Sequence, residues 1–313
     1  MRKVIGIGET LLDIVFRDGR PVEAVAGGST FNTIVSLARS GVRATFVSQV
    51  GDDRVGHEIL RFLEDNGIDP SCVATDPRMR TPLSLAFLDE AGNADYTFYR
   101  QTPAGADDLC QLPEIEPDDI VILGSFYAVD AARRPQVEAL LQRAREREAI
   151  VYYDINFRPA HRGDVVRITA NLLDNFEAAD VVRGSRDDFA TLFGHEDSDR
   201  VYRDRVAFYC KHFVATAGAD RVTAYGAGGL RREYDVPQVE TVSTIGAGDN
   251  FNAGLLFAMI RDGIRRRDLE RGLSEADWDS LIATATEFAA ESCRDLHNYI
   301  TKEFGQRQKG KQR

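Results

Sequence analysis

The chain has 313 residues and a mass of 34.8 kDa, so one large α/β domain or two smaller ones can fill it. Its 39 basic and 50 acidic residues give a formal net charge of −11, which argues against a general binder of nucleic acids or membrane surfaces, since both are anionic. The four cysteines form no CxxC pair, and no apolar run approaches the roughly 20 residues of a membrane helix, so we expect a protein of the cytoplasm without disulfides or a thiolate metal site.

Short apolar runs alternate with helical patterns along most of the chain. Residues 4–7, 45–50, 120–123, 150–153, 179–182 and 213–216 are predicted strands, and 30–40, 56–66, 133–148 and 276–292 are predicted helices. Such alternation favours a mostly parallel central sheet with helices on both faces. We therefore predict one α/β domain over residues 1–313, with three layers.

Two stretches have the pattern of antiparallel strand pairs. Residues 12–25 contain a turn at Asp18-Gly19-Arg20, and residues 81–103 contain alternating strands at 83–88 and 96–100 around a turn at 89–93. We expect both stretches to form a small β flap, or lid, beside the main sheet.

The first predicted strand is followed by polar and glycine positions that suit a ligand. Asp13 lies near the carboxyl end of this strand, where open α/β sheets bind ligands, although a solvent-facing turn aspartate is the alternative. Gly27 and Gly28 precede Ser29 and a helix, a pattern that favours a backbone site for an anion or a hydroxyl group. Helix capping by Ser29 or Thr30 would give the same pattern.

The most informative segment is a glycine-rich turn late in the chain. Gly246, Ala247 and Gly248 precede Asp249, and apolar residues then recur at helical spacing, so the turn is predicted to lie at a helix N-terminus that can bind an anion. A carboxylate there would repel a phosphate unless it accepts a proton from a hydroxyl that attacks the phosphate. The alternative is an ordinary N-cap aspartate.

Taken together, these segments resemble the ribokinase-like (PfkB-type) carbohydrate kinases. The similarity follows the order of the family's motifs and rests on residues 6–13, 26–32, 154–158, 216–218 and 243–254. It implies a ribokinase-like fold and transfer of the γ-phosphate of ATP, with Mg²⁺, to a carbohydrate hydroxyl. It also implies a possible homodimer, because flaps in this family often pair between subunits.

The resemblance assigns a role to each matching position. Asp249 is the catalytic base, and the N–H groups of Gly246, Ala247 and Gly248 hold the transferring phosphate. The residues implied to bind the sugar are Asp13, Gly27, Gly28, Asn32, Asn156 and Arg158. The residues implied to bind ATP are Ser185, Thr216, Gly218, Gly246 and Gly248, and Asp188 is implied to help hold Mg²⁺.

The flap segment narrows the expected sugar. Residues 96–100, followed by Ala106 and Asp107, resemble fructokinases and 2-keto-3-deoxygluconate kinases, in which the flap arginine reaches the sugar. Arg100 is therefore predicted to contact the substrate, with Tyr99 as a further contact and Phe98 packing within the flap. We favour a fructokinase, with a 2-keto-3-deoxygluconate kinase or another ribokinase-like sugar kinase as the alternative.

Three positions depart from the family pattern, all on the nucleotide and metal side. Ser243 and Ser185 stand where the family has Asp and Asn, and Arg221 stands where it has Gly. In some members of the family, the aspartate that Ser243 replaces helps to bind a monovalent cation. Activation by such a cation is therefore not favoured here. The departures also leave open a kinase-like sugar sensor that does not transfer phosphate.

Other functional classes fit the sequence less well. A dinucleotide-binding fingerprint would need glycine where Leu11 stands, and the Walker motif GxxxxGK[ST] does not occur. The five histidines are scattered, which argues against a metallohydrolase and predicts packing or surface roles for them. Residues 305–313 are predicted to be a frayed terminus.

Overall fold

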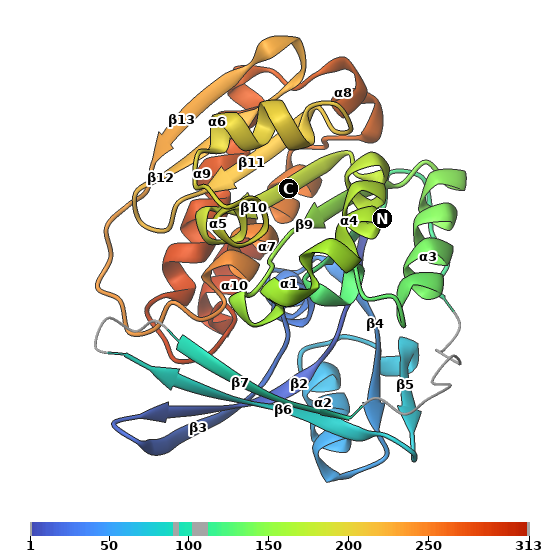
Figure 1. The fold of residues 1–313 in the computed structure, drawn as a ribbon, viewed down its shortest axis with the longest axis vertical. Coiled ribbons are helices and arrows are strands. Elements are labelled where there is room, and N and C mark those ends of the chain that lie inside the picture. The colour runs from blue at the N-terminus through green and yellow to red at the C-terminus, as the bar shows by residue number, and fades with distance from the viewer. Residues whose placement is uncertain (1, 90–93, 102–111, 312–313) are drawn as a thin grey trace.

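The main sheet of the protein runs through its centre (Figure 1). A computed structural model describes residues 2–89, 94–101 and 112–311, and in these ranges the main sheet has nine strands in the order β13-β12-β11-β10-β9-β8-β1-β4-β5. Neighbours from β11 to β5 pair in parallel, whereas β12 and β13 add antiparallel strands at one edge. The predicted α/β class with a mostly parallel sheet is confirmed.

The predicted strands all occur, with shifts at their ends. The strands of the main sheet are β1 (Lys3–Ile7), β4 (Arg43–Gly51), β5 (Val73–Asp76), β8 (Ile120–Gly124), β9 (Ile150–Asp154), β10 (Val181–Ser185), β11 (His212–Thr216), β12 (Arg221–Tyr225) and β13 (Arg231–Asp235). Strands β5, β12 and β13 were not predicted. They lie toward the two edges of the sheet, where strands are short or alternate with polar residues, so their apolar signal is weak.

Helices follow most strands of the sheet. They are α1 (Ser29–Arg39), α2 (Arg54–Asp65), α3 (Arg134–Glu146), α4 (Val165–Ala178), α5 (Arg186–Phe193), α6 (Ser198–Val201), α7 (Ala247–Arg261), α8 (Arg266–Arg271), α9 (Glu275–Ser292) and α10 (Lys302–Lys309). None of the helices in the described ranges combines the length and the apolar character needed to cross a bilayer.

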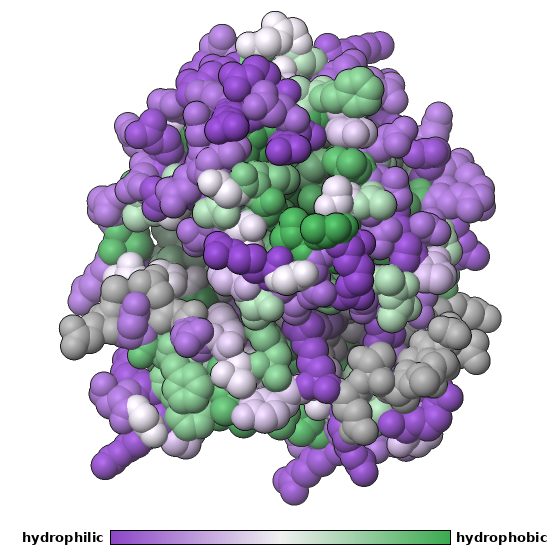
Figure 2. All heavy atoms as spheres, in the orientation of Figure 1, coloured by the Kyte–Doolittle hydropathy of each residue, from purple (hydrophilic) through white to green (hydrophobic). Residues whose placement is uncertain are grey.

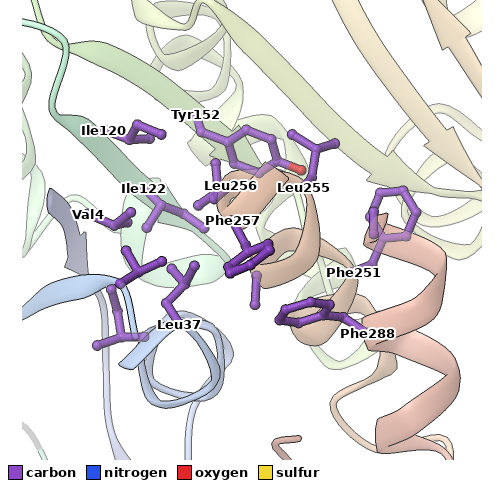
Figure 3. Close-up of a cluster of buried hydrophobic side chains, with 14 of the residues drawn as sticks. Val4, Leu37, Ile120, Ile122, Tyr152, Phe251, Leu255, Leu256, Phe257 and Phe288 are labelled. Carbon is purple, nitrogen blue, oxygen red and sulfur yellow. The ribbon is translucent and has the colours of Figure 1, made fainter. Parts of the chain in front are cut away.

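Two hydrophobic cores flank the main sheet and explain its three layers. Alternate residues of a strand point to opposite faces, so Val4 of β1 packs in one core and Ile5 in the other. Helices α1, α7 and α9 supply the first core, part of which Figure 3 shows, and α3 and α4 supply the second. The predicted three-layer arrangement is thus confirmed.

A smaller sheet lies across one end of the main sheet (Figure 1). Its strands are β2 (Leu11–Arg17), β3 (Arg20–Gly27), β6 (Arg80–Leu88) and β7 (Ala94–Gln101), in the order β3-β2-β6-β7. The two predicted hairpins are joined because β2 pairs in parallel with β6. Most of the predicted turn at 89–93, together with residues 102 and 103, lies outside the described residues.

The prediction of a frayed terminus at 305–313 is wrong for the described part. Thr301 caps helix α10, its hydroxyl accepting a hydrogen bond from the Phe304 N–H at 3.2 Å. Gly305 lies so close to the backbone of Arg39 that a β-carbon would contact it at 2.5 Å. The tail is therefore packed against α1, although its sequence is strongly polar.

Candidate active site

A pocket lies where the carboxyl ends of β1, β8 and β9 meet the N-termini of α1 and α7. Eight of the predicted site residues line it: Asp13, Gly28, Asn32, Arg100, Asn156, Arg158, Gly246 and Asp249. They come from the flap, the main sheet and two helices that are far apart in the sequence. Open α/β sheets bind ligands at this edge, so the location agrees with the fold.

Asp249 sits in the first turn of α7 with its carboxylate fixed from another helix. The Ser29 hydroxyl donates to Oδ1 at 2.7 Å and the Asn32 amide donates to Oδ2 at 2.8 Å. The cap position of α7 is Gly246, and no side chain caps this helix by a hydrogen bond. The alternative of an ordinary N-cap aspartate therefore does not describe Asp249, whose carboxylate lines the pocket.

The surroundings of Asp249 suit a proton acceptor. Burial raises its pKa from 3.8 to about 6, while the hydrogen bonds from Asn32 and Ser29 and the charge of Arg158 act to lower it. A carboxylate with a pKa of about 6 is largely ionised near neutral pH and accepts a proton more readily than an ordinary aspartate.

The glycine-rich turn presents part of its backbone to the pocket. Gly246 has a φ of 75°, a conformation that favours glycine, and its missing side chain leaves room for the carbonyl group of Asn298. The N–H of Ala247 donates to the Thr244 carbonyl at 3.2 Å, so this group is already used within the turn. Gly248 and Asp249 lie in the first turn, where a helix supplies no acceptor for N–H groups.

Asp13 is buried on the inner face of the flap with two donors. The Ser84 hydroxyl donates to Oδ1 through a short hydrogen bond, and the Asn298 amide donates to Oδ2 at 2.9 Å. Burial raises the pKa of Asp13 to about 6, and both hydrogen bonds act to lower it. Gly27 lies directly against this carboxylate, because a β-carbon at position 27 would collide with Oδ2.

Two arginines of the pocket have different partners. Arg100 Nη2 pairs with Glu9 Oε1 at 2.7 Å, and its guanidinium lies 4.6 Å from the ring centre of Phe98. The guanidinium of Arg158 lies 5.6 Å from the ring centre of Tyr96. Both guanidinium groups line the pocket and provide positive charge beside Asp13 and Asp249.

Side-chain alternation along β7 corrects the prediction for Tyr99. Tyr96, Phe98 and Arg100 line the pocket, whereas Tyr99 is 58% exposed on the opposite face. Phe98, expected to serve flap packing, thus faces the pocket in place of Tyr99. Successive side chains of a strand point to opposite faces, so Arg100 and Phe98 must share a face and Tyr99 must lie on the other.

Phe126 and Ser125, which the sequence analysis did not predict, complete the wall together with His161 and the predicted Asn156. Phe126 stacks on His161 with ring centres 4.0 Å apart, and both line the pocket. Asn156 donates from Nδ2 to Ser125 Oγ at 2.8 Å and has a φ of 37°. These residues follow β8 and β9, and only the parallel pairing of those strands brings them together.

Of the predicted ATP-binding residues, Gly246 lines the pocket, whereas Ser185, Thr216, Gly218 and Gly248 do not. Ser185 and Thr216 are register partners at the ends of β10 and β11, and Gly218, with a φ of 56°, follows in the next turn. Arg183 links this group to α7, because it donates from Nη2 to Thr216 Oγ1 at 2.6 Å and would contact a β-carbon at Gly248 at 3.1 Å. Their role in nucleotide binding stays a prediction.

The carboxylate oxygens of Asp188 are largely occupied by hydrogen bonds within the protein. Its oxygens accept hydrogen bonds from the Phe157 N–H at 2.6 Å and from the Ser185 N–H and hydroxyl at 2.6 and 2.8 Å. Within the described ranges, no three His, Cys, Asp or Glu side chains are grouped to hold a metal ion. Asp188 as a metal-binding residue stays a prediction.

Ser243 is buried, and its hydroxyl accepts a hydrogen bond from the Ile245 N–H at 3.1 Å. Arg221 is exposed and pairs with Glu233 at 3.4 Å. Neither residue lines the pocket.

Comparisons with known proteins agree with this geometry. The profile of the pfkB family carbohydrate kinases matches residues 1–297. The chain is 29% identical to a fructokinase of Rhizobium leguminosarum bv. trifolii over 87% of this chain and 84% of the relative, and 27% identical to a 5-dehydro-2-deoxygluconokinase of Geobacillus kaustophilus (strain HTA426) over 87% and 86%. The fold is similar to that of aminoimidazole riboside kinase from Salmonella enterica, with a TM-score of 0.82, 24% identity and 100% of both chains covered.

Proposed function

The chain belongs to the pfkB family of carbohydrate kinases, and we propose that it transfers the γ-phosphate of ATP to a hydroxyl group of a sugar bound beside Asp249. One observation supports this site above all others. A buried carboxylate lies in the first turn of α7, is oriented by two donors from α1, and lines a pocket at the carboxyl edge of the sheet. A hydroxyl group in this pocket meets a proton acceptor and a helix N-terminus at the same place.

The residues of the pocket divide the work of the reaction. Asp13, held by Ser84 and Asn298, binds sugar hydroxyl groups, and Asp249 accepts the proton of the attacking hydroxyl. The turn at Gly246 and Gly248, together with Arg158, stabilises the negative charge of the transferring phosphate. Gly246 and Arg158 line the pocket, and Gly248 follows in the first turn of α7. Mg²⁺ bound to the nucleotide would neutralise phosphate charge. The flap above the pocket excludes water, which otherwise accepts the phosphate in place of the sugar.

Two kinds of sugar are candidates for the substrate. Fructose is the first to test, because the segment around Arg100 resembles fructokinases and a curated relative carries that name. A six-carbon sugar acid is the alternative, because another relative is named a 5-dehydro-2-deoxygluconokinase.

The proposal predicts that Asp249→Asn removes catalysis while the fold is kept. Loss of the proton acceptor should lower kcat by about 10²- to 10⁴-fold. ADP release with a panel of sugars measures this loss, and circular dichroism and thermal unfolding control for the fold. Because the variant removes a buried charge, its Tm at pH 7.5 should be no lower than that of the natural chain.

Two outcomes contradict the proposal. If Asp249→Asn keeps its turnover, another group is the base. If the natural chain binds sugars and releases no ADP with any of them, the protein is a sugar-binding sensor.

We also propose that two copies of the chain associate through the outer face of the flap. The register places Leu83, Leu85 and Phe87 of β6 on the face of Tyr99, and Phe16 of β2 stacks on Phe87 with ring centres 4.8 Å apart. Phe87 and Tyr99 are 41% and 58% exposed. Figure 2 shows green, apolar residues among purple ones at the lower left of the molecule, where Figure 1 places strands of the flap. An apolar patch of this kind favours a protein partner.

A further inference from the structure

A second pocket adjoins the proposed sugar site along the same edge of the main sheet. We call it the distal pocket; it lies over the ends of β1 and β4, and its walls include Gln49, Met79, Tyr127 and Arg133. It shares Glu9, Arg100 and Phe126 with the first pocket, so the two pockets adjoin at these residues. Asp249 lines the first pocket and not the distal pocket.

Arg133 is the notable residue of the distal pocket. It is only 9% exposed, and its Nη1 donates to Gln49 Oε1 at 3.0 Å. Its guanidinium lies 5.7 Å from the ring centre of Tyr127. In the described ranges no carboxylate lies within the 4.0 Å that defines an ion pair with Arg133.

Two acidic residues, Glu9 and Asp130, also line the distal pocket, and each has another partner. Glu9 is paired with Arg100 at 2.7 Å, and it feels the charge of Arg133 without contacting it. Asp130 accepts a hydrogen bond from the Ala132 N–H at 3.4 Å within its own turn. A nearly buried guanidinium that lacks a carboxylate partner costs folding free energy, and a ligand carboxylate would remove that cost.

Neighbouring residues hold Gln49 and Arg133 in place. Gln49 is 6% exposed and donates from Nε2 to Asp76 Oδ2 at 3.4 Å, so its carbonyl oxygen faces Arg133. With Nη1 engaged by Gln49, the remaining N–H groups of Arg133 are available for a carboxylate, which guanidinium groups bind through paired hydrogen bonds.

We infer that the distal pocket binds a carboxylate at the end of the substrate opposite the hydroxyl group that is phosphorylated, so that the preferred substrate is a sugar acid. This inference rests on the proposed kinase function. It selects between the two candidate sugars, because fructose is neutral and would leave Arg133 without a partner.

The test compares 2-keto-3-deoxygluconate with fructose in the natural chain and in Arg133→Gln. Loss of a charged hydrogen-bond partner should lower kcat/KM for the acid by about 10- to 100-fold. The value for fructose should change less than about threefold, since no contact is lost. Arg145→Gln is the matched control, because Arg145 is exposed on α3 and the same charge is removed.

A binding measurement keeps the inference separate from the proposed function. Calorimetry with Asp249→Asn measures affinity for both sugars without turnover, and adding Arg133→Gln should weaken binding of the acid alone. Equal weakening of both sugars, or no weakening of the acid, overturns the inference. A large fall in the Tm of ligand-free Arg133→Gln also overturns it, because Arg133 would then be paired within the chain. Failure of turnover with intact, Arg133-dependent binding of the acid overturns only the kinase proposal.

Discussion

At the scale of single residues, the pocket is defined by two buried aspartates from distant parts of the chain. Burial raises the pKa of Asp13 and of Asp249 to about 6 each, against 3.8 for an ordinary aspartate. Because these pKa values are higher in the folded state, each carboxyl group contributes stability that is fully present below pH 4 and is lost as the pH rises through 6. Two carboxyl groups with raised pKa values in one pocket support the roles proposed for them in binding and catalysis.

The first prediction at this scale concerns pH. Both carboxyl groups must be ionised, so kcat/KM for the sugar should fall as the pH drops through about 6. Asn32→Ala removes a hydrogen bond that lowers the pKa of Asp249, so the acid limb should move up by up to about one pH unit. The control is Asn171→Ala, in which a hydrogen bond to the Val129 carbonyl is lost; neither residue lines the pocket. An acid limb that stays in place in Asn32→Ala contradicts the assignment of Asp249 as the base.

The second prediction concerns Asn298, which joins Asp13 to the glycine-rich turn. Its side-chain amide donates to Asp13 Oδ2 at 2.9 Å, and its backbone carbonyl accepts from Asn250 Nδ2 at 2.9 Å. Asn298→Ala keeps the backbone contact and removes the side-chain donor, so KM for the sugar should rise by about 5- to 10-fold, equivalent to roughly 1 kcal/mol. KM for ATP should not change. Equal increases in both KM values would indicate a general loss of structure and contradict a role in positioning Asp13.

At the scale of elements, helix α7 combines the site with the core. Its first turn faces the pocket, and the residues after it pack against α1 and α9. In Figure 3, Phe257 lies between Leu37 of α1 and Phe288 of α9. Gly254 makes the contact with α9 close: a β-carbon there would meet Ala285 Cα and the Thr284 carbonyl oxygen at 2.7 Å. The backbones of the two helices thus touch, which fixes the position of the first turn.

A substitution at this contact tests the element. Gly254→Ala should destabilise the protein by about 1–3 kcal/mol, because the added methyl group forces α7 and α9 apart. Thermal unfolding measures the loss, and Gly163→Ala, where a β-carbon meets nothing within 4 Å, is the control. If Gly254→Ala unfolds at the same temperature as the natural chain, the close contact does not stabilise the helix pair.

At the scale of the whole molecule, the small sheet of the flap supplies part of the pocket that lies at the edge of the main sheet. The inner face of the flap contributes Asp13, Phe98 and Arg100 to the pocket, and its outer face exposes Phe87 and Tyr99. Association of two flaps would bury the outer faces and leave the pockets accessible. The proposed dimer would therefore also stabilise the flap strands that hold the residues proposed to bind the sugar.

The prediction at this scale is that positive charges introduced on the outer face of the flap prevent the association of two copies of the chain. Phe87→Lys with Tyr99→Lys should shift the mass found by sedimentation from that of a dimer to that of a monomer, because lysines in an apolar interface lose their hydration. Phe208→Lys is the control, since Phe208 is 89% exposed and lies outside the flap. A natural chain that sediments as a monomer contradicts the proposed dimer.

The sequence by itself determined the features that depend on neighbours along the chain. The alternation of apolar strands and helices predicted the α/β layers, and Gly246 to Asp249 already identified the acidic residue at a helix N-terminus. The resemblance to the carbohydrate kinases implied Asp13, Asn32 and Arg100 as separate positions, and each lines the pocket. Such features are local because backbone periodicity and helix starts depend on a few consecutive residues.

Only the tertiary structure decided which side chains meet. Asn298 reaches Asp13 across 285 positions, and Asn32 reaches Asp249 across 217, because packing of α1 against α7 and of the tail against α1 brings them together. The parallel pairing of β2 with β6 joined two hairpins that look independent in the sequence. The distal pocket around Arg133 likewise depends on strands β1 and β4 and on the flap. Contacts between distant segments leave no repeating pattern in the chain, so burial and packing alone select them.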